Sequence, residues 1–376
     1  MPSDLIQFGS KLDAQQIAST LAFLFESNLK NELKTGERPT PICIWGTHGL
    51  GKTQMVLEYA REQNWKMAYC APAQFEEMGD LHGLPTKMDP DPTRFGDEYT
   101  MYLPPDWVPT EEGPGILLLD DFNRADDRIL RGLMQLLQNF EMFSWSLPPK
   151  WQIVCTANPE GGDYSVTPMD DAMLTRLLHL TMVFDVKAWA SWAVQNDIDP
   201  RGVAFVLTYP EVITGKRSTP RSITQFFQQL RHIPDLQANL DRVLILANSS
   251  LDEVTVSTFL SFINDNLSTL IHPEEILSAT DFSEIKKRIE ALSKGTHGAR
   301  RIDRLATICT RLYLHMAQPQ YTPAELEARN LVLFLLLDVL PNDLRFSLHR
   351  DLVALGPTVI EMLKDPKLSR LILAGM

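Results

Sequence analysis

A glycine-rich stretch near the start of the chain has the residue types and spacing of a phosphate-binding loop. It fits the pattern G-x-x-x-x-G-K-[ST] at every fixed position and consists of Gly46, Thr47, His48, Gly49, Leu50, Gly51, Lys52 and Thr53. Glycines at the fixed positions let backbone N–H groups turn inward around phosphate oxygens, where a side chain would clash. The lysine would reach the β- and γ-phosphates, and the hydroxyl of Thr53 would bind Mg²⁺.

Two carboxylates follow residues 116–119, an apolar run typical of a buried parallel strand. Open α/β sheets bind ligands at the carboxyl ends of their strands, so Asp120 falls where it could hold the same Mg²⁺ as Thr53. Asp121 would stand nearby and orient an attacking water. An aspartate pair is also a common strand exit, and only the preceding loop favours the metal interpretation. Asn158 follows another strand-like run and could touch this water or the γ-phosphate, although a lone asparagine there is more often a turn former.

These side chains require a parallel sheet, and the sequence predicts its elements. The apolar run 42–45 precedes the loop, and helix-favouring residues follow it, which is the context that the loop needs. Further strands are predicted at 66–70, 116–119, 143–145, 151–156 and 178–184, and helices at 12–33, 52–64 and 126–140. The many prolines of residues 71–115 predict an irregular segment.

After Asp185 the pattern becomes helical throughout. Helices are predicted near 187–196, 200–208, 220–232, 236–248 and 254–269, with three or four more beyond 281, the most apolar at 302–316 and 331–340. Arg221 lies in the first turn of one of them. The helix dipole disfavours a cation there, so this arginine is easier to explain if an anion faces it.

The sequence therefore predicts an α/β fold, with a P-loop parallel sheet flanked by helices and followed by all-helical regions. The expected divisions are an N-terminal helix (1–35), a nucleotide-binding domain (36–185), a helical lid (186–275) and a C-terminal helical extension (276–376).

Composition places the chain among globular proteins. It has 376 residues, 44% hydrophobic and 22% charged, which predicts a packed core. No uncharged apolar run reaches the length of about 18 residues that a membrane span needs, and no secretory signal is evident. The four cysteines form no C-x-x-C pair. We therefore expect reduced core thiols and a cytoplasmic location.

The net charge of −13 argues against broad nucleic-acid binding. A basic segment at 286–304 is better interpreted as a solvated helix face and loop than as a nucleic-acid contact, although a local basic loop is not excluded.

The order of motifs resembles AAA+ ATPases, most closely the MoxR-type group. In that family the P-loop is followed by a Gly-Asp/Leu-Gly element, a strand ending in Asp-Glu-x-Asn-Arg-Ala, a strand ending in Ala-x-Asn-Pro, an arginine before the last strand and a Pro-Arg pair in the lid. The corresponding residues here are 78–83, Asp120 to Ala125, Thr156 to Pro159, Arg176 and Pro220-Arg221. The similarity covers residues 36–275, with one residue fewer between Ala157 and Asn158.

The resemblance implies roles for several residues and an assembly. Asn158 would be the first sensor, Arg176 an arginine finger acting in trans, and Arg221 the second sensor. It also implies a ring, with a hexamer as the expected size, that hydrolyses ATP with Mg²⁺ and remodels a protein client. The client would be a von Willebrand factor A domain protein. The family has glutamate where this chain has Asp121, and the shorter side chain predicts slow hydrolysis.

Two other functions remain open from the sequence. The first is an ATP-dependent switch or assembly scaffold that hydrolyses too slowly for mechanical work, with the helical tail as a docking platform. The second is a nucleic-acid motor, which the net charge disfavours. No motif selects ATP over GTP.

Overall fold

The computed structural model describes residues 6–88, 99–161, 165–214, 216–264, 271–294, 301–318 and 321–374. The chain divides into two compact units, Met1–Asp185 and Val186–Met376, and each is described by itself. The first unit holds all the strands of the described chain, and the second is helical.

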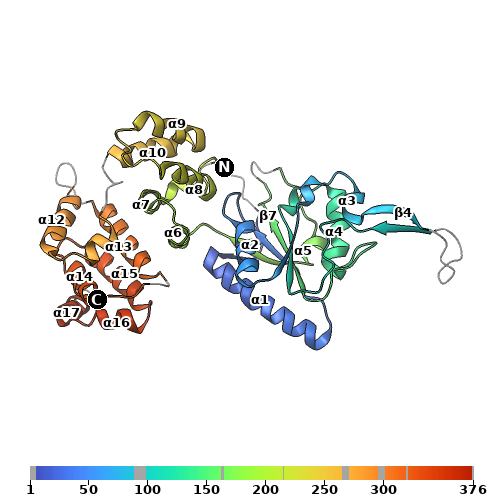
Figure 1. Ribbon diagram of the computed structural model, residues 1–376, viewed down its shortest axis with the longest axis horizontal. Coiled ribbons are helices and arrows are strands. Elements are labelled where there is room, and N and C mark those ends of the chain that lie inside the picture. The colour runs from blue at the N-terminus through green and yellow to red at the C-terminus, as the bar shows by residue number, and fades with distance from the viewer. Residues whose placement is uncertain are drawn as a thin grey trace. The chain divides into compact units, whose positions relative to one another are not determined.

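The first unit is built on a six-stranded sheet in which every neighbouring pair is parallel (Figure 1). Its order is β1-β8-β2-β7-β6-β3, so the predicted α/β fold class with a parallel sheet is confirmed. The strands are β1 (Ser10–Leu12), β2 (Ile42–Trp45), β3 (Lys66–Cys70), β6 (Gly115–Leu119), β7 (Trp151–Ala157) and β8 (Leu178–Met182). The edge strand β1 was not predicted, because three residues carry too little periodicity to be recognised.

Helices cover both faces of this sheet because alternate strand residues point to opposite sides. Ile42 and Ile44 of β2 pack in one apolar cluster with residues of α1 (Ala14–Thr35) and α2 (Lys52–Glu62). Cys43 and Trp45 of the same strand pack in a second cluster with α4 (Asp127–Asn139). Both faces are thus buried, which explains why β2 and β6 are apolar at every position.

The proline-rich segment contains more structure than predicted. It forms η1 (Pro72–Gln74), α3 (Met78–His82) and an antiparallel hairpin of β4 (Leu84–Met88) and β5 (Tyr99–Leu103), which projects from the first unit in Figure 1. Both strands of a two-stranded hairpin are edges, so Pro85 is tolerated in β4. The prediction of a strand at 143–145 was wrong. The structure has no strand there, and only an isolated antiparallel bridge joins Glu141 and Ser146.

The first unit also contains the short elements η2 (Phe122–Arg124) and α5 (Asp171–Leu174). The helices of the second unit are α6 (Val186–Gln195), α7 (Pro200–Thr208), η3 (Pro210–Thr214), α8 (Pro220–Leu230), α9 (Leu240–Ser250), α10 (Glu253–Asn264), α11 (Pro273–Leu277), α12 (Phe282–Leu292), α13 (Ile302–Met316), α14 (Glu325–Leu335), α15 (Asn342–Val353), α16 (Pro357–Met362) and α17 (Pro366–Ala374).

The apolar run 331–340 does not form one helix, which corrects the sequence prediction. Helix α14 ends at Leu335, and Arg345 of α15 donates to the carbonyl oxygens of Leu335, Leu337 and Leu340. This buried guanidinium satisfies carbonyls that a continued helix would have bonded internally.

The four cysteines are free and buried. Burial raises the pKa of Cys43 well above its ordinary value and that of Cys70 to about 12, so both stay neutral thiols. In the described chain, no helix combines the length and the hydropathy that crossing a membrane requires.

Candidate functional site

The predicted phosphate loop lies between β2 and α2, at the carboxyl edge of the sheet. Gly49 (φ 76°) and Gly51 (φ 93°) adopt left-handed backbone conformations, which a residue with a Cβ takes up only at a cost. Gly51 is also the N-cap of α2, and no atom lies within 4 Å of where its Cβ would stand. The glycines therefore keep the start of α2 open, where the dipole and the backbone N–H groups favour an anion.

Lys52 is 6% exposed, and its ammonium group lies under this loop. Its Nζ donates to the carbonyl oxygens of Gly46 (2.7 Å) and Thr47 (3.2 Å) and to Oδ1 of Asn158 (3.3 Å). An ammonium group has three protons to donate, so a phosphate oxygen would replace one of these acceptors. Lys52 and Asn158, which follow different strands, thus lie in direct contact.

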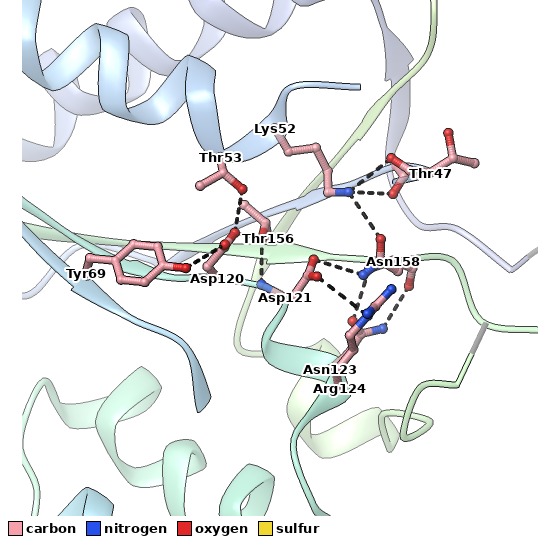
Figure 2. A network of polar contacts seen from close by, with 11 residues as sticks. Thr47, Lys52, Thr53, Tyr69, Asp120, Asp121, Asn123, Arg124, Thr156 and Asn158 are labelled. Atoms are coloured by element: carbon pink, nitrogen blue, oxygen red, sulfur yellow. Dashed lines mark hydrogen bonds and ion pairs between the residues drawn. The ribbon is translucent and has the colours of Figure 1, made fainter. Parts of the chain in front are cut away.

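Asp120 is surrounded by hydroxyl groups (Figure 2). Its Oδ1 accepts from Thr53 (2.5 Å) and Thr156 (2.7 Å), and its Oδ2 accepts from the phenol of Tyr69 (2.9 Å). Burial, followed by the hydrogen bond to Asp120, raises the pKa of Tyr69 to about 12, so this phenol remains a donor at neutral pH. Sequence reasoning missed Tyr69 and Thr156.

Asp121 adopts a left-handed conformation (φ 48°, ψ 38°), which aspartate and asparagine tolerate better than most residues. Its Oδ1 accepts from Nδ2 of Asn158 at 2.9 Å, and its Oδ2 lies 3.5 Å from Nε of Arg124. Both carboxylate oxygens therefore have partners. Asn158 bridges Lys52 and Asp121, which makes it the central side chain of the cluster in Figure 2.

The side chains present fit a nucleotide with Mg²⁺. Thr53 and Asp120 supply hydroxyl and carboxylate oxygens, the ligand type that Mg²⁺ prefers, and they lie in direct contact. Among the described residues no group of three or more His, Cys, Asp or Glu side chains could hold a metal. A metal ion here would consequently need oxygens from the bound phosphates, as in other phosphate loops.

Arg176, in the same unit as this cluster, does not join it through any described contact. Arg176 follows α5, and its guanidinium donates to Oε1 of Gln138 (3.0 and 2.9 Å) and to the carbonyl oxygen of Ala172. Arg221 is exposed in the first turn of α8, where Thr219 is the N-cap and Pro220 the first helical residue. Their predicted roles remain predictions.

No model of a protein family matches this chain, and no curated protein matches it. Solved structures that are similar include the Thermotoga maritima RuvB Holliday junction branch migration motor (16% identity, 83% of this chain and 94% of RuvB, TM-score 0.37). A presumed ATPase from Cytophaga hutchinsonii is 14% identical over 79% of this chain and 74% of its own, with a TM-score of 0.31. At such scores and identities the likeness carries no conclusion about individual residues, substrates or assembly.

Proposed function

We propose that this chain is a MoxR-like AAA+ ATPase that assembles into a ring and uses ATP hydrolysis to remodel or activate a partner protein. The observation that carries the proposal is the cluster at the carboxyl edge of the sheet. There the P-loop lysine, a hydroxyl–carboxylate pair and an acid–amide pair come together from β2, β6 and β7, which are neighbours in the sheet.

Each group has a role in the proposed reaction, in which water attacks the γ-phosphorus and ADP and phosphate leave. Lys52 and the start of α2 bind the phosphates and stabilise their charge. Asp121 orients the attacking water, and Asn158 fixes the acid relative to the lysine. Mg²⁺ held by Thr53 and Asp120 would neutralise charge that develops on the phosphate oxygens.

Lengthening the acid at position 121 is expected to speed hydrolysis. The Asp121→Glu carboxylate would reach about 1 Å further toward the water, and a misplacement of that size can cost on the order of 10²-fold in rate. We expect a higher steady-state ATP turnover in Asp121→Glu, together with a melting temperature lowered by the left-handed backbone at this position.

Asp121→Asn is the matched control, because asparagine tolerates the same backbone and keeps an oxygen for the amide of Asn158. Its turnover should fall below that of the wild type. A turnover of Asp121→Glu no higher than the wild type would count against the proposed cause of slow hydrolysis.

A slow ATP-dependent switch is the second candidate, favoured by one observation. Each oxygen of Asp121 already has a partner, the Asn158 amide at 2.9 Å and the Arg124 guanidinium at 3.5 Å, so fewer of its lone pairs are available to orient a water. Turnover above about 1 s⁻¹ in the presence of a partner would exclude the switch, since typical enzyme values begin there.

The partner class rests on the family resemblance alone, which suggests a von Willebrand factor A domain protein. Such a partner should bind more tightly with ATP than with ADP if hydrolysis drives its remodelling. Equal affinity in both nucleotide states would remove this part of the proposal.

A further inference from the structure

The side chain of Asn123 makes two hydrogen bonds to the main chain of Asn158. Its Oδ1 accepts from the Asn158 N–H at 3.0 Å, and its Nδ2 donates to the Asn158 carbonyl oxygen at 2.8 Å. Both residues are buried, with 0% and 1% exposed. Only one orientation of the Asn123 amide satisfies the donor and the acceptor together, so the pair defines a two-point clamp between η2 and the end of β7 (Figure 2).

This clamp acts on the residue at the centre of the proposed site. Residue 158 lies just beyond β7, where the sheet no longer holds its backbone. Once its main chain is fixed, two side-chain torsions decide where its amide lies. That amide accepts from Lys52 at 3.3 Å and donates to Asp121 at 2.9 Å, so a shift of the backbone would disturb both contacts.

The same turn also holds the segment that follows. The Asn123 carbonyl oxygen accepts from the N–H of Thr167 (2.8 Å), and the Thr167 hydroxyl donates to the carbonyl oxygen of Ala125 (2.7 Å). The turn that follows Asp120 and Asp121 therefore holds the chain at positions 158 and 167. Asn123 is the only side chain that the described contacts place on the main chain of Asn158.

We propose that Asn123 is a positioning residue for nucleotide hydrolysis, holding Asn158 so that its amide spans Lys52 and Asp121. The inference rests on the proposed function, because it assigns Asn123 to the same reaction. It predicts that Asn123 affects the hydrolytic step and acts only through Asn158.

A double-mutant cycle on turnover tests this inference. Asn123→Ala should lower kcat by about 10- to 100-fold, since a displacement near 1 Å can cost about 10²-fold, while the affinity for ATP stays nearly unchanged. In an Asn158→Ala background the same change should cause no further loss. An equal loss in both backgrounds, or an unchanged kcat in the single variant, would overturn the proposal. Asn31→Ala, at an exposed position of α1, is the matched control.

Amide hydrogen exchange tests the clamp without any hydrolysis. In the nucleotide-free protein, Asn123→Ala removes the acceptor of the Asn158 N–H and should speed its exchange. Unchanged exchange at Asn158 in Asn123→Ala would overturn the inference even if the protein hydrolyses ATP. A wild type without hydrolysis would instead refute the proposed function, so the two failures are distinguishable.

Discussion

The Lys52→Ala variant is expected to bind ATP at least about 10²-fold more weakly than the wild type and to lose measurable hydrolysis. A hydrogen bond to a charged group contributes about 1.5–3 kcal/mol, and the lysine would make such bonds to two phosphates. Each 1.4 kcal/mol corresponds to about tenfold in affinity. Calorimetric titration with Mg·ATP would measure the loss.

Lys30→Ala is the control for this variant. Lys30 is exposed on α1 and pairs with Glu26 one turn away, so its removal takes the same charge from the first unit without touching the site. Its ATP affinity should match the wild type. Because the Lys52 ammonium group also bonds the loop carbonyls, the melting temperature of Lys52→Ala must be measured alongside. An affinity within about threefold of the wild type would exclude Lys52 from phosphate binding.

The Arg176→Ala variant is expected to bind ATP normally and to hydrolyse it at least about 10³-fold more slowly, the size of effect that arginine fingers have. In this structure the guanidinium donates to Gln138 of its own chain. None of its described contacts is with a residue proposed to bind the nucleotide, so its loss should not lower the affinity for ATP. Arg131→Ala on α4, which removes an exposed arginine paired with Asp127, should leave turnover unchanged.

Mixing variants separates a shared site from a self-contained one. Lys52→Ala subunits lack a working site but still carry Arg176, so mixing them with Arg176→Ala subunits should restore part of the turnover. Full hydrolysis by Arg176→Ala alone would show that Arg176 is not an arginine finger. A loss of turnover that mixing cannot restore would indicate that the arginine acts within its own chain.

Much of the site could be predicted because parallel strands end at one edge of the sheet. Lys52, Asp120 and Asn158 follow three different strands, and the parallel direction of these strands predicts that all three lie at one edge of the sheet. Their direct contact also requires that β7 lies between β2 and β6, and this order is not evident from the sequence.

The missed residues depend on details that the sequence pattern does not contain. Tyr69 reaches Asp120 because β3 lies beside β6, and the neighbours of a strand are set by the whole sheet. Asn123 faces Asn158 because it lies in the short 3-10 turn that follows Asp121. The left-handed backbone of Asp121, which starts this turn, is not evident from the residue types. Thr156 was part of a recognised motif, and its place two residues before Asn158 could have indicated that it also faces this edge.

The measurement that tests the central claim most directly is ATP turnover per subunit across a range of protein concentrations, with light scattering on the same samples. A site completed by Arg176 of a neighbouring subunit predicts that turnover rises with concentration as a larger Mg·ATP-dependent particle forms. A protein that stays monomeric and hydrolyses ATP at a rate independent of concentration would contradict the shared-site ring.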